Sequence, residues 1–286
     1  MVHTMIPFVL RQLWRFIILL LGITLLYVIV LMVWPESGSR LAAFAALLVI
    51  YCLMAYVVIP NLMRLFHIFS KPDHIPLYVT TGDGWPSDPV NIAVIARDRK
   101  HLREAMKQAG WYEADPHSVK NNLREAWSII FNMPYPTAPV STLYLFNRHH
   151  DIAFQIPTNG RMSARTRHHV RFWRLEPPLR DRHDRGHFDF WSGKLRKWLH
   201  REQEIWIGAS TEDFRPLDVR WRTGSLTHGV SHEADKERDF IIQTLQDQKL
   251  IRSVQISEPG EHFKFRGQSF RTVYTTDGSL RVVHIK

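Results

Sequence analysis

Two long runs of apolar residues lie close together near the start of the chain. They cover residues 16–34 and 41–59, and only the segment from Pro35 to Arg40 separates them. Each run holds about 19 residues, which as a helix extend about 28 Å, close to the ~30 Å of a bilayer's hydrocarbon core. A backbone in hydrocarbon must satisfy its own hydrogen bonds, so the pattern predicts an antiparallel transmembrane hairpin.

Two other interpretations of these runs are weaker. A secretory signal peptide has an apolar core of about 7 to 15 residues that ends at small residues. The first run is longer and ends at Trp34 and Pro35, although Ser37 to Ser39 leave a weak cleavage signal. Core helices of a soluble domain carry a polar stripe at the helical period, and neither run has one.

The flanking cations predict how the hairpin is oriented. Arg11 and Arg15 precede the first run, and Arg64 and Lys71 follow the second, whereas the loop between them has one cation and one carboxylate. Lys and Arg next to a span stay preferentially on the cytoplasmic side. The sequence therefore predicts a membrane protein with both termini in the cytoplasm.

After the hairpin, strand and helix patterns alternate, which predicts a mixed α+β soluble domain. The expected organisation is a hairpin over residues 1–70, a linker rich in Pro, Gly and Asp over 71–87, and the domain over 88–286. Strands are expected at 91–95, 142–147, 152–155, 168–175, 204–210, 251–256, 270–275 and 279–284, and helices at 99–109, 116–131, 191–201 and 234–249.

Local start and stop signals support these elements. Asp98 is suited to cap the first domain helix, and Gly110 is suited to end it. Asp115 and Pro116 have the chemistry of an N-cap and first helical position, so the second helix is expected to begin there. Asp277-Gly278 is typical of a hairpin turn between the last two strands.

The excess positive charge is local. The net charge of the chain is +10, and the segment 161–201 alone has 12 basic and 4 acidic residues together with five histidines and six Phe or Trp. A tethered cytoplasmic domain faces anionic lipid headgroups, which attract Lys and Arg. Apposition to the membrane surface is therefore the favoured explanation. Nucleic acid is disfavoured because of the tether, and a solvated loop with scattered ion pairs is the simplest alternative.

Several short motifs in consistent order resemble the LssY C-terminal domain. They are Asp88-Pro89-Val90-Asn91-Ile92-Ala93, Ala109-Gly110-Trp111-Tyr112, Ala114-Asp115-Pro116, the segments 134–141 and 143–146, Asp151-Ile152-Ala153-Phe154-Gln155, Arg167-His168-His169-Val170-Arg171-Phe172-Trp173, Trp206-Ile207-Gly208-Ala209, Thr227-His228, and Asp235 with Glu237, Arg238 and Asp239. The resemblance covers roughly residues 85 to 245. The family has no settled biochemical activity, and its name comes from a bacterial secretion-linked locus.

In other chains the family's domain follows membrane modules such as a region like a lipid-phosphate phosphatase. That chemistry requires a nucleophilic His with Lys, Arg and a second His around a phosphate, on a bundle of several spans. The two apolar runs contain no charge and no histidine. The resemblance therefore implies an accessory domain anchored in the bacterial inner (cytoplasmic) membrane and linked to the envelope or to secretion. Membrane lipid is the expected partner, and a membrane protein is a second candidate.

The domain has one set of residues suited to catalysis. His169 on a strand, Asp213, His228 and Asp239 are the candidates, since histidines and carboxylates from different elements form metal sites and acid–base pairs. Their spacing matches no metal signature, so no cofactor is predicted. A non-catalytic module is favoured over the alternative, a metal- or histidine-dependent hydrolase of a phosphorylated or lipid-linked substrate.

The strand 168–175 suggests a third interpretation. His168, Val170 and Phe172 share the face expected to join the core. The opposite face is expected to meet water, lipid or a ligand, and its side chains would form a pocket for a phosphate or lipid headgroup. The candidate binding residues are Arg167, His169, Arg171 and Trp173.

Overall fold

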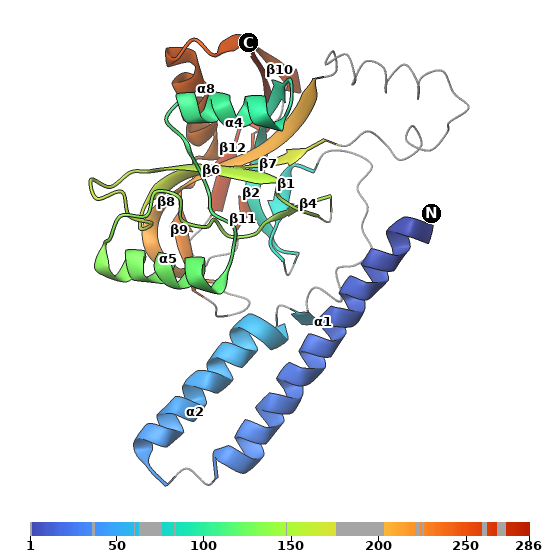
Figure 1. The fold of residues 1–286 in the computed structure, drawn as a ribbon, viewed down its shortest axis with the longest axis vertical. Helices are drawn as coiled ribbons and strands as arrows, with labels where there is room; N and C mark the ends of the chain where they lie inside the picture. Colours follow the sequence, from blue (N-terminus) through green and yellow to red (C-terminus); the bar gives the residue numbers. More distant parts are fainter. Residues whose placement is uncertain are drawn as a thin grey trace.

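The computed structural model describes residues 2–35, 38–59, 61–62, 76–82, 84–146, 148–175, 203–220, 224, 226–258, 262–267 and 273–286. Two antiparallel helices form its N-terminal part and extend from one end of an α/β domain (Figure 1). Helix α1 spans Val2–Val28 and continues as a π-helical turn, η1, over Ile29–Val33. Helix α2 spans Arg40–Leu53 and continues as η2 over Met54–Val58.

Both helices are long and apolar enough to cross a membrane. The candidate spans are Leu13–Met32 and Arg40–Val58, and only 17% of the most apolar window in each is buried. A core helix of a soluble protein is mostly buried, so this exposure argues against that alternative. Ser39 caps α2 by accepting a hydrogen bond from the backbone N–H of Ala42 at 3.2 Å.

The domain is built on a curled, mainly antiparallel sheet. The main path runs in the order β3-β6-β7-β8-β2-β1-β4-β5. The strands on this path are β1 (Tyr78–Thr80), β2 (Pro86–Ala96), β3 (Tyr112–Glu113), β4 (Tyr144–Leu145), β5 (Arg148–His149), β6 (Ile152–Pro157), β7 (Arg167–Arg174) and β8 (Glu204–Val219).

The remaining strands complete the domain. They are β9 (Leu226–Val230), β10 (Ile251–Glu258), β11 (Phe263–Arg266), β12 (Val273–Thr276) and β13 (Leu280–Ile285). Strand β13 pairs with β10 and, in parallel, with β2, whereas β11 and β12 form a separate pair. Strand β8 is long enough to pair with β2 and β7 in its first half and with β9 in its second.

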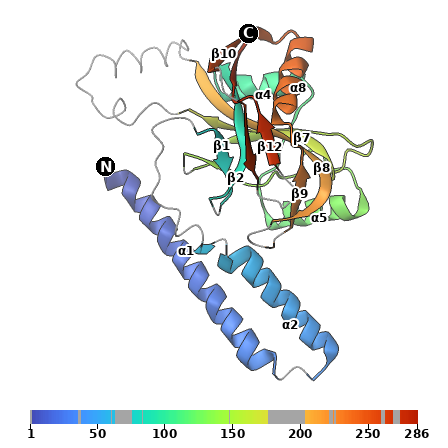
Figure 2. The same ribbon diagram turned by 180° about the vertical axis from the view of Figure 1, so that it is seen from behind.

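Two helices cover one face of the sheet, as the view from behind also shows (Figure 2). They are α4 (Arg99–Gln108) and α8 (Ala234–Asp247). Their buried side chains pack with alternate residues of β6, β7 and β8 in the main hydrophobic cluster. Its members include Leu102, Met106, Phe154, Val170, Phe172, Trp206, Ile241 and Leu245.

The centre of this sheet is too tightly packed for a side chain at Gly208. A Cβ atom there would lie 2.6 Å from Ile92 Cγ2 and 2.7 Å from Phe172 Cε1. The opposite face has a second, smaller hydrophobic cluster that includes Ala93, Ile207 and Trp173. Next to it lie buried polar and charged side chains.

The third domain helix, α5 (Val119–Phe131), lies at the end of the domain that faces α2 (Figures 1 and 2). Its N-cap is Ser118, whose side chain accepts a hydrogen bond from Asn121 N. The sequence prediction of a start at Asp115 and Pro116 is therefore wrong. The Asp115 carboxylate instead accepts hydrogen bonds from Tyr135 and Thr137.

Three other expectations differ from the structure or fall outside it. Residues 78–80 and 86–87, expected in the linker, belong to β1 and β2. Strands β12 and β13 flank Asp277-Gly278 but do not pair with each other, so no hairpin forms there. The helix expected at residues 191–201 lies outside the described residues.

Candidate functional site

Strand β7 places charged side chains inside the curl of the sheet. Arg167, His169 and Arg171 alternate along it and are 2 to 3% exposed, and Trp173 continues the same face within the smaller hydrophobic cluster. The strand therefore has no outward face at these four positions, which differs from the sequence prediction. Burial also contradicts the expectation that the charges of Arg167 and Arg171 lie at a surface.

All the nitrogens of the Arg167 guanidinium have partners. Nε donates to Asp213 Oδ2 at 3.2 Å, and Nη1 donates to the Pro139 carbonyl at 3.1 Å and to Gln155 Oε1 at 2.9 Å. Nη2 donates to Glu125 Oε1 at 3.0 Å and lies 3.4 Å from His228 Nε2. A phosphate would have to displace one of these groups to bind Arg167.

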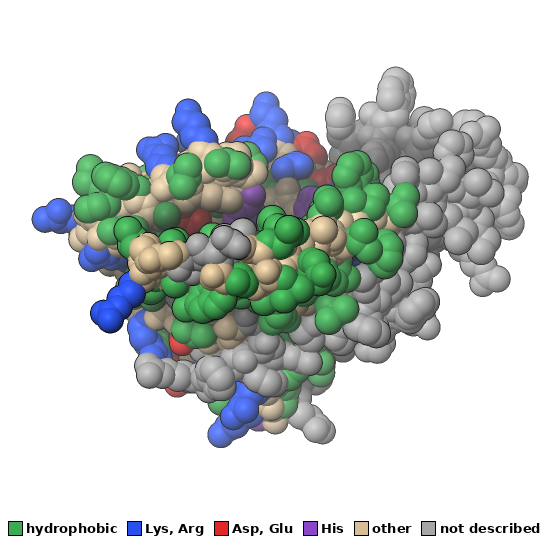
Figure 3. Space-filling view, turned by 90° about the horizontal axis from the view of Figure 1, so that it is seen from below, with side chains coloured by type: hydrophobic (Ala, Val, Ile, Leu, Met, Phe, Trp, Pro, Cys, Tyr) green, Lys and Arg blue, Asp and Glu red, His purple; other side chains and the backbone are tan. Residues whose placement is uncertain are grey.

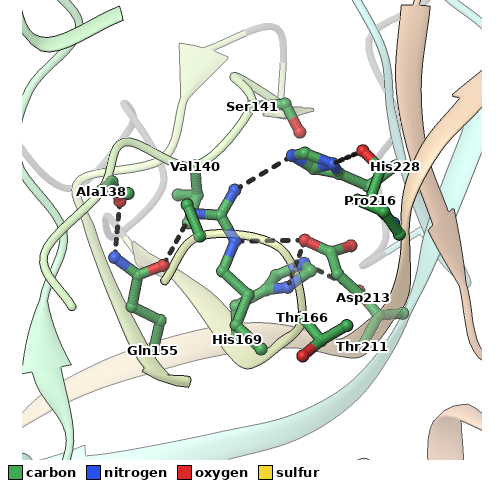
Figure 4. Close-up of polar contacts among 12 residues, drawn as sticks. Ala138, Val140, Ser141, Gln155, Thr166, His169, Thr211, Asp213, Pro216 and His228 are labelled. Atoms are coloured by element: carbon green, nitrogen blue, oxygen red, sulfur yellow. Dashed lines mark hydrogen bonds and ion pairs between the residues drawn. The ribbon is translucent and has the colours of Figure 1, made fainter. Parts of the chain in front are cut away.

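Three of the predicted catalytic candidates converge around this arginine (Figure 4). His169 Nδ1 lies 3.5 Å from Asp213 Oδ2, and His169 Nε2 lies 2.9 Å from the hydroxyl of Thr211. His228 lies on the other side of Arg167, with Nδ1 at 2.9 Å from the Pro216 carbonyl. A carbonyl only accepts, so His228 carries its proton on Nδ1 and offers Nε2 to Arg167.

Burial keeps both histidines of this cluster neutral. It lowers the pKa of His169 well below the usual value and also lowers that of His228, although Asp213 opposes both shifts. Burial alone would raise the pKa of Asp213, but the positive charges of Arg167 and Arg171 hold it well below its ordinary value. The cluster is therefore an ion-paired arginine and aspartate flanked by neutral imidazoles.

A second buried ion pair extends the cluster along β7. Arg171 Nη1 donates to Asp88 Oδ2 at 2.7 Å, and its other nitrogens donate to Ser141. The hydroxyl of Tyr274 donates to the second carboxylate oxygen of Asp88 at 2.9 Å. Asp88 is 2% exposed. Removing either charge would leave the other without a partner in a medium of low polarity.

Helix α5 closes the cluster with its polar face. Glu125 points inward to Arg167, and its Oε1 is also 4.0 Å from His228 Nε2. Ser128 Oγ donates to the Met133 carbonyl and accepts from Ala164 N, and Asn132 Oδ1 accepts from Ser163 Oγ at 2.6 Å. The side chains of Glu125 and His228 are 17% and 19% exposed, so solvent reaches the cluster beside this helix.

The outer face of α5 is apolar and open. Its exposed side chains, with their exposed fractions, are Val119 (80%), Leu123 (67%), Trp127 (58%), Ile130 (64%) and Phe131 (51%). A surface helix of a soluble domain normally turns its apolar stripe toward the core. Helix α5 has the reverse orientation, with carboxylate and amide groups inside and apolar side chains outside.

The end of β8 adds to this apolar surface. Phe214, Leu217 and Val219 are 39%, 60% and 40% exposed. The connection between β8 and β9 reaches the helical hairpin, where the Tyr51 hydroxyl donates to the Gly224 carbonyl at 2.5 Å. In the view from this end, the apolar side chains of the helical hairpin lie nearest the viewer, and Lys and Arg side chains project at the rim of the molecule (Figure 3).

The fourth catalytic candidate, Asp239, lies elsewhere. It is on α8, and its carboxylate is paired with Arg238 and 63% exposed. Arg238 also contacts Asp235 and Asp277, so this group is a separate ion-pair network. Among the residues that the structure describes, no three His, Cys, Asp or Glu side chains are arranged to hold a metal ion. The assignment of catalytic and ligand-binding roles stays a prediction.

His168, expected to be a satisfied core histidine, has its partner on α8. Its Nδ1 lies 2.7 Å from Glu237 Oε2, and its ring packs against that of Phe240 with centroids 4.3 Å apart. The pair borders a pocket of about 110 Å³ that Glu212 and Glu233 also line. Burial raises the pKa of Glu237 to about 7, although His168 opposes the shift.

The residues that hold the cluster together were not predicted from the sequence. Glu125 looks like an ordinary solvent-facing helix residue, and neither Asp88 nor Gln155 has a recognisable spacing to β7. The alternation along β7 was the one local signal, since it placed Arg167, His169 and Arg171 on the same face. It could not show that this face is covered.

Comparison with known proteins gives one match. Residues 73–280 match the model of a family described as the LssY C-terminus. No curated protein and no solved structure matches the chain significantly.

Proposed function

Because this chain belongs to the LssY C-terminal family and carries its family domain behind two apolar helices, we propose that it is a membrane-anchored module that works at an anionic lipid surface. The hairpin crosses the bacterial inner membrane, both termini are cytoplasmic, and the domain rests on the cytoplasmic leaflet. Membrane lipid is its primary partner. A role in an envelope- or secretion-linked process would follow from this position.

The observation that carries the proposal is the placement of the hairpin relative to the domain's exposed cations. Helix α5 lies at the end from which the hairpin extends, and Lys120 and Arg124 are exposed on it (Figure 1). Each cation close to an anionic leaflet contributes about 1 kcal/mol of attraction. Arg124 also lies over the ring of Tyr135, with its Cζ 4.0 Å from the centroid, so its side chain is held in place.

The test uses the full chain in vesicles with and without phosphatidylglycerol. A donor dye on Asn122→Cys, in a Cys52→Ser background, reports energy transfer to acceptor-labelled lipid headgroups. Transfer is expected to rise with the anionic lipid and to fall with added salt, because salt screens the attraction. Lys120→Glu with Arg124→Glu should abolish that rise, whereas the matched pair Lys100→Glu with Lys107→Glu on α4 should not. Transfer that is independent of lipid charge would contradict the proposal.

A histidine-dependent hydrolase is the second candidate, and the convergence of His169, His228 and Asp213 is the observation that favours it. His228 is the more accessible of the two histidines, so it is the group expected to meet a substrate. A phosphorylated or lipid-linked substrate would have to replace Glu125 on Arg167, because all the Arg167 nitrogens are engaged.

Phosphate release from lipid phosphates by the reconstituted chain tests this second candidate. His228→Gln should reduce it at least tenfold, while His232→Gln, a surface histidine that bonds the Val273 carbonyl, should leave it unchanged. Equal rates for wild type and His228→Gln would exclude His228 as the reacting group.

A further inference from the structure

Helix α5 exposes more apolar surface than its place on a soluble domain explains. Its five large exposed side chains lie within one stripe, and the rings of Trp127 and Phe131 pack together with centroids 4.1 Å apart and planes tilted by 40°. Phe214, Leu217 and Val219 are exposed at the end of β8, which lies near α5 in both ribbon views (Figures 1 and 2). Contiguous apolar patches of this kind mark sites where a protein or a membrane binds.

We propose that α5 and the end of β8 form a lipid-binding surface that inserts into the interfacial layer of the same bilayer that the hairpin crosses. The outer face of α5 would lie parallel to the membrane plane at the boundary of headgroups and acyl chains. This inference rests on the proposed anchoring. It goes beyond that proposal because apolar side chains of the domain would insert into the bilayer, in addition to the attraction between its cations and anionic lipid.

The position of the hairpin indicates that the occupant is lipid. Tyr51 lies within the second candidate span, and its hydroxyl contacts Gly224 in the β8–β9 connection. The end of β8 therefore lies beside a segment that belongs in the bilayer. Both ribbon views place α5 at this same end of the domain (Figures 1 and 2).

The charges beside the apolar stripe suit a membrane interface as well. Lys120 and Arg124 lie next to the stripe on one flank of α5. The long side chain of Lys120 can extend to phosphates while its methylene groups stay in the apolar layer, and Arg124 adds a positive charge held over the Tyr135 ring. Trp127 has an amphipathic ring of the kind that concentrates at membrane interfaces. Interfacial helices combine these features.

Insertion would also act on the buried cluster. The polar face of α5 carries Glu125, which holds Arg167 and lies close to His228. A change in the depth or tilt of α5 would thus move the carboxylate that closes the cluster. The lipid-facing side chains and the Glu125 carboxylate that contacts the histidine cluster lie on opposite faces of one helix.

Single-cysteine probes on the full chain in vesicles test the proposal. In the Cys52→Ser background, an environment-sensitive dye is placed on Leu123→Cys, on Ile130→Cys, or on Lys107→Cys of α4 as the matched control. Each is exposed to lipid-borne nitroxide and to aqueous iodide. The dyes at positions 123 and 130 should be quenched at least twofold more by the nitroxide and shielded from iodide, with the reverse at position 107.

Iodide quenching at 123 and 130 equal to that at 107 would show a solvated face and overturn the proposal. Shielding from both quenchers would indicate a protein occupant, a second copy or another chain, and would also overturn it. Nitroxide quenching in vesicles lacking anionic lipid would support insertion even if the charge dependence proposed above failed. In the double variant Leu123→Gln with Ile130→Gln, a dye on Asn122→Cys should no longer report an interfacial position. The near-ultraviolet circular dichroism of the domain should be unchanged.

Discussion

Glu125 accepts a hydrogen bond from Arg167 at 3.0 Å, and this contact joins α5, a domain helix with an outward apolar stripe, to the buried centre of the sheet. The two residues are 42 positions apart in the chain and come from α5 and β7. Their side chains are 17% and 2% exposed. The pair therefore lies at the boundary between the closed interior of the domain and the end that faces the hairpin.

Replacement of Arg167 should be strongly destabilising. In Arg167→Met, Asp213 and Glu125 lose their common cation and Gln155 loses a donor, so the free energy of unfolding should fall by about 3–5 kcal/mol. Chemical denaturation of the full chain in detergent, followed by tryptophan fluorescence, measures this loss. The exposed Arg161→Met should change the stability by less than about 0.5 kcal/mol. Similar stabilities for the two variants would contradict the structural role given to the buried pair.

Gly208 should not tolerate even a methyl group. Gly208→Ala places its Cβ within 2.7 Å of both Ile92 and Phe172, so the core must shift, at a cost of about 1–3 kcal/mol. The matched control is Gly160→Ala, because a Cβ there meets nothing within 4 Å. Thermal unfolding of both variants compares them directly. A melting temperature of Gly208→Ala equal to that of wild type would mean that β2, β7 and β8 pack less closely than described.

The Glu237 pair should make stability depend on pH. The folded-state pKa of Glu237 is about 7, above its ordinary value of 4.5, so folding favours the protonated acid. Its contribution is complete below about pH 4.5 and is lost as the pH rises to about 7. The raised pKa of His168 acts in the same direction, since its contribution is also lost with rising pH.

Unfolding of wild type and Glu237→Gln between pH 5 and pH 8 isolates this contribution. The stability of wild type should fall relative to the variant by up to about 3 kcal/mol over this range. The lowered pKa values of His169 and His228 make both chains less stable in acid, and this effect cancels in the comparison. Parallel pH profiles would show that Glu237 has an ordinary pKa in the folded chain.

Elements whose signals are local were predictable from the sequence. Asp98 accepts a hydrogen bond from His101 N at 2.8 Å, and α4 begins and ends within one residue of the predicted bounds because its cap and terminal glycine are close in the chain. The predicted start of α5 was wrong because the role of Asp115 depends on distant residues. Asp115 is used by Tyr135 and Thr137, about 20 residues later, and no local pattern shows that such partners exist.

The candidate site was only partly predictable. Alternation along β7 correctly placed Arg167, His169 and Arg171 on one face. Whether that face is buried depends on elements that precede and follow β7 in the chain, and no local pattern shows where they pack. The apolar stripe of α5 shows a second limit of sequence prediction. Periodicity reveals that a stripe exists, and it does not reveal whether protein or lipid covers it.

The most direct measurement is photo-crosslinking of the full chain to lipids that carry a diazirine in the acyl chain, with mass spectrometry to locate the modified residues. Within the domain, modification should concentrate on residues 119–133 of α5 and its C-terminal end and on 214–219 of β8, and α4 and α8 should remain unmodified. Modification spread evenly over the domain, or absent from α5 while the hairpin helices are labelled, would contradict a domain that rests on the membrane through this end.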